Sequence, residues 1–194
     1  IDYLKDVGMT DIVLTSHYIK STDYNSNQAQ RKKIFKQLKS KIEKTGIHLY
    51  LGNEVYIFED IIEKIKSQAI FTLNQTNYIL VELPLLEHMH ADLDILFELV
   101  ASGVHVVLAH PERYVLFQKD PKLIEKYTDM GILLQGNYES LVGKYGKKAE
   151  KLMKEWLKEH KYFTLSSDVH KENSNFFGQF PKVHKKLMKL VDQT

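Results

Sequence analysis

Histidine and carboxylate residues stand at the ends of several apolar segments, which is the residue chemistry of a shared metal site. The residues at these ends are His17, Glu54, Glu82, His110, Asn137 and Asp168, with His170 two positions further on. Imidazole suits borderline divalent metals, and carboxylates can bridge two ions, as phosphatase chemistry often requires. A single such residue at a strand end is ordinary. The repetition predicts one metal site that several segments share.

The segments that precede these residues are expected to be β-strands. They cover residues 11–17, 48–54, 78–82, 104–110, 131–137 and 162–168. Their apolar residues are nearly continuous, which is typical of strands covered on both faces, as in parallel sheets and barrels. In parallel α/β folds the carboxyl ends of the strands gather at one edge, where active sites lie. We therefore expect the candidate ligands to meet at that edge.

Helical patterns fill the intervals between the strands, as in a series of βα units. They cover residues 27–45, 58–68, 91–102, 120–130, 150–160 and 180–191. The apolar stripe of the first helix includes Ile34, and that of the third includes Phe97. Asp120 is expected as an N-cap, with Pro121 at the first helical position. No linker interrupts the series, so we expect one domain over residues 1–194.

Two short motifs could hold a metal or a phosphate. Asp168 and His170 form a D-x-H pair, whose side chains project to the same side of an extended segment. The segment HPERY follows the fourth strand, and its guanidinium, that of Arg113, can clamp a phosphate in a bidentate fork. The structural alternatives are a capped strand end for His110 and an ion pair for Arg113.

The remaining candidates also have structural alternatives. Glu54 and Glu82 follow apolar strands, where a carboxylate is costly unless it is paired or coordinated. Hydrogen bonds to backbone N–H groups would satisfy either carboxylate without a metal. His17 has the same strand-end placement. The polar segment 20–30 after it is either a surface loop or a substrate-binding loop.

The composition excludes several classes of protein. The chain has 194 residues, 43% of them hydrophobic, which is enough for a substantial core. No apolar run approaches the roughly 20 residues of a membrane helix, and the first residues show no signal-peptide pattern. The absence of cysteine excludes disulfides, thiolate zinc sites and a cysteine nucleophile. A net charge of +2 is too small for charge-driven nucleic-acid binding. We expect a cytoplasmic protein without membrane insertion.

Six segments in this order resemble the PHP (polymerase and histidinol phosphatase) superfamily. They are LTSHY, GNEVY, YILVELP, VVLAHPERY, LLQGNYESLVGKYG and SSDVH. Within the superfamily they are most similar to the metal-dependent protein-tyrosine phosphatases encoded with bacterial capsule and exopolysaccharide genes. The resemblance covers nearly the whole chain. The blocks AHPERY, ELP and QGN-x-x-SL-x-G-x-x-G are specific to that branch.

The resemblance implies a distorted (β/α)7 barrel of the α/β class, with two to three metal ions at the carboxyl ends of the strands. Manganese is the usual metal of this branch, with iron, cobalt, zinc and magnesium as alternatives. The implied ligands are His17, Glu54, Glu82, His110, Asp168 and His170. Glu54 matches the bridging carboxylate, and Arg113 matches the phosphate-binding arginine.

The chain departs from the pattern at its start. The H-x-H pair of the family's first strand and the D-D-G loop after it are absent. The resemblance therefore implies a PHP barrel that lacks its first strand and begins inside the first helix, with fewer ions as an alternative to the family's two to three. The apolar edge so exposed is a candidate surface for a second copy of the chain.

The function implied is metal-dependent hydrolysis of phosphotyrosine on a protein. The expected partner and substrate is the phosphotyrosine-containing tail of an autophosphorylating bacterial tyrosine kinase that controls capsular or exopolysaccharide synthesis. One alternative is a small-molecule phosphatase, such as one acting on histidinol phosphate. Another is an impaired module that binds the tail without turnover, which the missing strand motivates.

Overall fold

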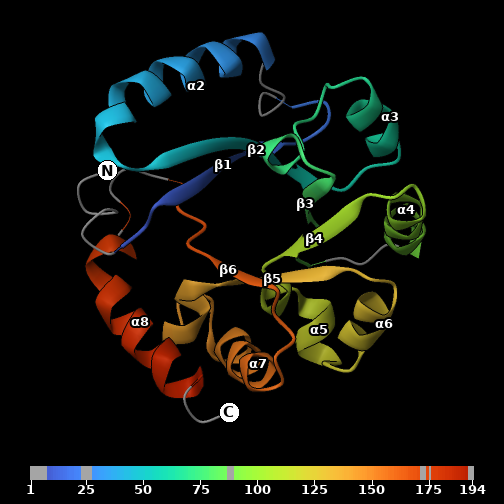
Figure 1. Ribbon diagram of the computed structural model, residues 1–194. Helices are drawn as coiled ribbons and strands as arrows, with labels where there is room; N and C mark the ends of the chain where they lie inside the picture. Colours follow the sequence, from blue (N-terminus) through green and yellow to red (C-terminus); the bar gives the residue numbers. More distant parts are fainter. Residues whose placement is uncertain (1–7, 23–27, 87–89, 171–173, 175, 192–194) are drawn as a thin grey trace. The chain divides into compact units, whose positions relative to one another are not determined.

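A computed structural model describes residues 8–22, 28–86, 90–170, 174 and 176–191 (Figure 1). The expected helical start at residues 1–7 lies outside this set. Contacts divide the chain into two compact units, Ile1–Glu82 with Ala91–Val106, and Leu83–His90 with Val107–Thr194. The single domain remains a prediction. None of the helices in the described parts of the chain is long and apolar enough to cross a membrane.

The first unit is built from three parallel strands and the helices that connect them. Its elements are β1 (Asp11–Tyr18), α2 (Gln28–Ile42), η1 (Glu43–Thr45), β2 (His48–Tyr56), α3 (Ile61–Lys66), η2 (Leu73–Gln75), β3 (Tyr78–Glu82) and, apart from its first residue, α4 (His90–Ala101). β1 pairs with β2 so that His17 lies opposite Glu54. β2 pairs with β3 so that Tyr56 lies opposite Glu82. The registers bring the three candidate ligands to the same end of the strands.

Helix α2 covers one face of β1 and β2 (Figure 1). The packed residues of this cluster are Ile12, Leu14, Phe35, Leu38, Ile42, Ile47 and Leu49. Ile34 is 54% exposed, so its placement on the buried stripe was wrong. A helical residue turns by about 100°, which carries Ile34 off the row formed by Phe35, Leu38 and Ile42. Phe97 of α4, 61% exposed, was misplaced for the same reason, because Leu96 and Leu99 face the core.

The second unit repeats the strand–helix alternation. The boundary between the units falls within β4 (His105–Ala109), and the elements after it are η3 (Pro111–Arg113), α5 (Val115–Lys119), α6 (Leu123–Asp129), β5 (Leu133–Asn137), η4 (Tyr138–Val142), α7 (Lys147–Lys158), β6 (Thr164–Ser166) and α8 (Phe176–Val191). β5 pairs in parallel with β4 and with β6, with Ala109 opposite Gln135 and Asn137 opposite Ser166. The pairing again aligns the strand ends.

Aromatic and aliphatic side chains form the core of the second unit. The Phe117 ring lies 5.0 Å from that of Tyr127 and 6.0 Å from that of Trp156, both edge-on. Leu141, Met153, Val183 and Leu187 form a cluster that joins η4, α7 and α8. Offset and edge-on aromatic pairs stabilise a core beyond the area they bury. This packing stabilises the unit that carries the candidate ligands His110, Asp168 and His170.

Several boundaries differ from those expected. Helix α6 begins at Leu123, because Asp120–Lys122 forms a turn in which the Asp120 carboxylate accepts the Lys122 N–H at 3.2 Å. Asp120 therefore makes a cap-like bond two residues before the N-cap residue Lys122, and Pro121 precedes the helix. α8 begins at Phe176 rather than at residue 180, and the short helix α5 was missed.

The strands also differ from the expected pattern. β6 keeps only Thr164–Ser166, so Asp168 lies two residues beyond it. Three of the eight residues of β1 are exposed, among them Val13, which is 42% exposed. Coverage on both faces, which the continuous apolar run predicted, is therefore wrong for β1. It holds best for β3 and β4, whose central residues are fully buried.

Candidate metal and phosphate sites

Three strand-end residues converge in the first unit. The Nε2 atom of His17 lies 3.9 Å from an Oε2 atom of Glu54 and 3.8 Å from that of Glu82. The side chains of Glu54 and Glu82 are only 5% and 13% exposed. Both separations exceed the normal length of a hydrogen bond. The His17 imidazole therefore lies within 4 Å of two carboxylates.

The residues before Glu54 explain its position. The backbone of Gly52 passes so close to η2 that an added Cβ would lie 2.7 Å from the Leu73 Cδ2 atom. Asn53 is fully buried, donates from Nδ2 to the Ser16 carbonyl at 2.9 Å and accepts the Phe71 N–H at 2.8 Å. The Asn53 amide thereby ties β1 and the segment before η2 to β2. The next residue, Glu54, is held at the strand end.

The donor set of this cluster fits a divalent cation. Ligand atoms bonded at about 2.1 Å to one ion lie about 3 to 4 Å from one another, and the two measured separations fall in that interval. A ligand oxygen of Glu54 lies within 4.8 Å of one of Glu82, and a bound cation would offset the repulsion between two such carboxylates. His17 with either carboxylate therefore offers the mixed nitrogen and oxygen ligands that a divalent metal ion can bind.

In the second unit, His110 follows β4 in an unusual backbone conformation. Its φ of 35° lies in the left-handed region, and its N–H donates to the Gln135 carbonyl at 2.7 Å. The next residues turn sharply through η3, whose Pro111 cannot extend the strand ladder. The buried Tyr114 hydroxyl donates to the Ala109 carbonyl at 2.8 Å and accepts the Leu83 N–H at 3.0 Å. The HPERY segment is thus folded back on its own strand.

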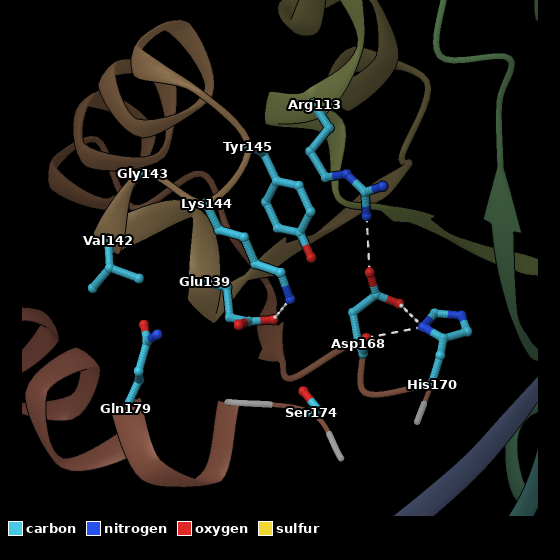
Figure 2. Close-up of a pocket in the computed structure, with 10 residues that line it drawn as sticks. All are labelled: Arg113, Glu139, Val142, Gly143, Lys144, Tyr145, Asp168, His170, Ser174 and Gln179. Atoms are coloured by element: carbon cyan, nitrogen blue, oxygen red, sulfur yellow. Dashed lines mark hydrogen bonds and ion pairs between the residues drawn. The ribbon is translucent and has the colours of Figure 1, made fainter. Parts of the chain in front are cut away.

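Arg113, Asp168 and His170 meet beyond β6 (Figure 2). The Arg113 Nη1 atom lies 2.8 Å from an Asp168 Oδ2 atom, and the His170 Nδ1 atom lies 3.4 Å from the other oxygen. Asp168 has a φ of 49°, also left-handed. The structure brings together an expected phosphate ligand and two expected metal ligands. An ion pair for Arg113, the structural alternative, is present here.

A buried carboxylate, that of Glu112, organises the backbone around these residues. It accepts hydrogen bonds from the Ser140 hydroxyl at 2.6 Å, the Asn137 N–H at 3.0 Å and the Tyr162 hydroxyl at 3.0 Å. Burial raises the pKa of Glu112 above its usual value, which these hydrogen bonds partly counteract. Burial, together with the neighbouring Glu112, also raises the pKa of Tyr162 well above 10. Glu112 therefore joins η3 to β5, η4 and the residue ahead of β6.

A cavity of about 670 Å³ opens beside Arg113. Its lining residues are Arg113, Glu139, Val142, Gly143, Lys144, Tyr145, Asp168, His170, Ser174 and Gln179 (Figure 2). The Lys144 ammonium is paired with the Glu139 carboxylate, which is only 3% exposed. The wall thus combines a paired lysine, an aromatic ring and the Arg113 guanidinium. An anionic group of a substrate could enter here and reach Arg113.

The described residues place each expected site residue within one of the two units. The first unit holds His17, Glu54 and Glu82, and the second holds His110, Arg113, Asp168 and His170. Sequence reasoning did not assign roles to four residues that support these groups, namely Asn53, Glu112, Ser140 and Tyr145. Each lies in one of the six segments that resemble the PHP superfamily. Its position close to a candidate ligand in the sequence was the one indication that it could support the site.

Comparison with solved structures shows the class of fold. The chain superposes on a structure from a study of "unique metal-dependent tyrosine phosphatases", YwqE from Bacillus subtilis and CpsB from Streptococcus pneumoniae, with a TM-score of 0.81. The identity is 21%, over 98% of this chain and 81% of the other. Histidinol phosphate phosphatase from Lactococcus lactis, solved with zinc, L-histidinol and phosphate, gives a TM-score of 0.62 at 15% identity, over 99% and 84% of the two chains. The expected α/β fold of PHP type is confirmed.

The family follows from the sequence comparisons. The chain belongs to the family described as "Capsular polysaccharide synthesis, CpsB/CapC", whose profile matches residues 1–192. A Staphylococcus aureus protein, CapC, named as a candidate tyrosine-protein phosphatase, is 33% identical over 84% of this chain. The tyrosine-protein phosphatase YwqE of Bacillus subtilis is 27% identical over 89% of it. The chain spans 64% and 68% of the lengths of these two relatives.

Proposed function

We propose that this chain is a metal-dependent phosphatase domain that hydrolyses phosphotyrosine on proteins. The observation that carries the proposal is the convergence of His17, Glu54 and Glu82 from three neighbouring strands. The chain's family also supports the proposal, because relatives similar to this chain are named tyrosine-protein phosphatases. Arg113 beside its cavity supplies the complementary phosphate ligand. The six proposed metal ligands are His17, Glu54, Glu82, His110, Asp168 and His170.

The proposed metal ligands and Arg113 have different roles in hydrolysis. A divalent ion held by the proposed ligands would activate the attacking water and neutralise phosphoryl charge. Arg113 binds the phosphoryl oxygens through its forked N–H donors and stabilises the charge that develops on them. Water adds to phosphorus, the bond to the tyrosine oxygen breaks, and tyrosine and phosphate are released. The chain has no cysteine that could form a covalent intermediate.

The substrate, partner and metal are part of the same proposal. The substrate is the phosphotyrosine-containing tail of a bacterial tyrosine kinase that regulates capsular or exopolysaccharide synthesis, and the reaction takes place in the cytoplasm. The family description, capsular polysaccharide synthesis, supports this assignment. Manganese is the proposed metal, because it is the usual metal of the phosphatase branch that the six sequence segments resemble.

Turnover of p-nitrophenyl phosphate by the purified chain tests the proposal. Chelator-treated protein should be inactive, and Mn²⁺ should restore hydrolysis, with Mg²⁺, Zn²⁺, Co²⁺ and Fe²⁺ assayed in parallel. Arg113→Lys should lower kcat/KM by about 10-fold or more, because a lysine cannot form the bidentate fork. Turnover that is unaffected by the chelator would overturn the metal-dependent mechanism.

Two substrates separate this proposal from the alternatives. A phosphotyrosyl peptide should be hydrolysed with a higher kcat/KM than histidinol phosphate. The reverse order would indicate a small-molecule phosphatase. Binding of the peptide in the presence of metal without release of phosphate would indicate a binding module rather than an enzyme.

A further inference from the structure

Four side chains around the cavity of the second unit form a closed ring of contacts. Arg113 pairs with an Asp168 Oδ2 atom at 2.8 Å, and the Asn137 Nδ2 atom donates to the same oxygen at 3.0 Å. Asn137 Nδ2 also lies 3.3 Å from the Tyr145 hydroxyl oxygen. The Arg113 Cζ atom lies 4.3 Å from the centre of the Tyr145 ring, which closes the ring of contacts.

The orientation of Asn137 is fixed by its other hydrogen bonds. Its Oδ1 atom accepts the Glu139 N–H at 2.9 Å, so the amide nitrogen must face Asp168 and Tyr145. Its own N–H donates to Glu112 at 3.0 Å, and the residue is fully buried. Asn137 is therefore a rigid support that holds the Tyr145 hydroxyl on one side and the Asp168 carboxylate on the other.

Tyr145 is placed by the turn that carries it. Gly143 and Gly146 flank this turn with φ values of 79° and 92°, which side chains rarely adopt. A Cβ at Gly143 would also lie 3.0 Å from a Glu150 carboxylate oxygen. Burial raises the pKa of Tyr145, so the hydroxyl stays protonated at neutral pH. The turn thus presents a neutral aromatic face to Arg113 (Figure 2).

The contact between ring and guanidinium has a direct consequence for phosphate binding. The long arginine side chain has many rotamers, and ordering it on binding opposes affinity. Stacking on an aromatic face and pairing with Asp168 fix the plane of the guanidinium before phosphate arrives. The recorded bond to Asp168 uses Nη1, and a guanidinium has five N–H donors in all.

We propose that Tyr145 is a positioning residue for Arg113, which it holds in the orientation that receives the phosphoryl group of the substrate. Tyr145 acts through Arg113 and makes no bond to phosphate itself. The inference rests on the proposed phosphatase function, since it concerns the same site. It adds a residue from the turn after η4 to the phosphate site.

Substitutions that separate the ring from the hydroxyl test the inference. Tyr145→Leu removes the stacking face and should lower kcat/KM for a phosphotyrosyl peptide by about 5- to 30-fold. It should raise the inhibition constant of inorganic phosphate by a similar factor, with little change in thermal stability. Tyr145→Phe keeps the ring and loses the hydroxyl's long bond to Asn137 and its interaction with Lys144, so at most about a 3-fold loss is expected.

A double-mutant cycle distinguishes positioning from a direct or purely structural role. If Tyr145 acts through Arg113, then Arg113→Ala combined with Tyr145→Leu should be no more than about 2-fold worse than Arg113→Ala alone. Multiplication of the two separate losses would overturn the inference, as would wild-type kinetics of Tyr145→Leu. Tyr50→Leu is the matched control, because the recorded hydrogen bond of Tyr50 is to Asp11 in the first unit.

The same variants separate this inference from the proposed function. An active wild type with an unaffected Tyr145→Leu variant would overturn the inference and leave the phosphatase function standing. If the wild type shows no turnover, the Kd for a fluorescent phosphotyrosyl peptide replaces kcat/KM as the measurement, with the same expected ratios. Absence of both turnover and peptide binding in the metal-loaded wild type would overturn both.

Discussion

Two of the proposed metal ligands, His110 and Asp168, have left-handed backbone conformations. Their φ values are 35° and 49°. For residues other than glycine such conformations cost roughly 1 to 3 kcal/mol and persist only where the surroundings impose them. The Gln135 carbonyl holds the His110 N–H, and Arg113 and Asn137 hold the Asp168 carboxylate. Strain at both positions favours a functional role over an ordinary strand end.

At the same scale, the metal site can be tested by a single isosteric change. Glu54→Gln keeps the shape of the side chain but removes the negative charge next to His17. Loss of groups that merely support metal ligands costs about 10- to 100-fold in metal affinity or activity, so loss of a ligand should cost at least about 100-fold. Metal content by plasma spectrometry and p-nitrophenyl phosphate turnover are the measurements.

Glu59→Gln is the control for this substitution, because Glu59 is exposed just beyond β2. It should retain both metal and activity. A Glu54→Gln protein with full metal content and normal turnover would exclude Glu54 as a ligand.

At the scale of elements, the segment from β5 to α7 is built around glycines and one asparagine. In β5, a Cβ on Gly136 would lie 2.8 Å from Tyr162 Cε1, 2.9 Å from Leu165 Cδ2 and 3.0 Å from Met153 Cε. A Cβ fits there only if the ends of these three side chains move. Asn137 follows directly and caps η4 through the Glu139 N–H. The close packing of Gly136 therefore sets the position of Asn137.

We expect Gly136→Ala to destabilise the protein by about 1 to 3 kcal/mol through overpacking. The measurement is urea unfolding followed by near-ultraviolet circular dichroism, which reports the packing of Tyr162 and Trp156. Gly103→Asn is the control, since nothing lies within 4 Å of a Cβ there and asparagine tolerates its φ of 85°. Equal stability of Gly136→Ala and wild type would show that the strand has room to adjust.

An ion-pair group joins α7 to α8 and should make stability depend on pH. The Glu150 carboxylate accepts from Lys154 at 2.6 Å and from Lys186 at 2.8 Å, which lowers the pKa of Glu150 to about 2. A lowered pKa stabilises the fold above the unfolded value of 4.5, and the contribution is lost as pH falls from 4.5 towards 2. Because the group is partly solvated, about 1 kcal/mol is expected.

Urea unfolding of Glu150→Gln and wild type at several pH values measures this contribution. The variant should be less stable by about 1 kcal/mol at pH 7, and the difference should shrink at about pH 3. Glu155→Gln, which removes an exposed pair with Lys151 at 3.6 Å, should have a smaller effect. A difference that does not change with pH would contradict the proposed ion-pair origin.

At the scale of the whole molecule, each unit carries its own group of site residues. The first unit gathers two carboxylates and an imidazole, and the second gathers the arginine with an aspartate and a histidine. In each unit parallel pairing between neighbouring strands aligns the residues, whereas the loops and short helices after the strands fix their side chains. Binding of a metal should therefore stabilise the folded protein as a whole.

Thermal unfolding with and without metal tests this coupling. A ligand that binds only the folded state stabilises it by about 2.7 kcal/mol at a concentration 100 times its Kd. Mn²⁺ should therefore raise the Tm of chelator-treated wild type by several degrees. The rise should be lost in His17→Ala and kept in the Glu59→Gln control. An equal rise in His17→Ala would place the stabilising metal elsewhere.

The sequence by itself determined the order of strands and the residues at their ends. Continuous apolar runs end at His17, Glu54 and Glu82, and parallel pairing needs only such runs separated by helices. The resemblance then identified the family and selected these residues as ligands. Local patterns were less reliable for helix faces, as Ile34 and Phe97 show, because amphipathic stripes one residue apart cannot be separated by hydropathy alone.

The tertiary structure decided which residues support the site. Glu112 and Asn137 are polar residues in the sequence, and only folding buries them and brings Ser140, Tyr162 and Asp168 within hydrogen-bonding distance. The stacking of Arg113 on Tyr145 joins residues 32 positions apart, which no local pattern encodes. Strand ends are set by short-range patterns, whereas the orientation of a guanidinium depends on side chains that only the packed structure brings together.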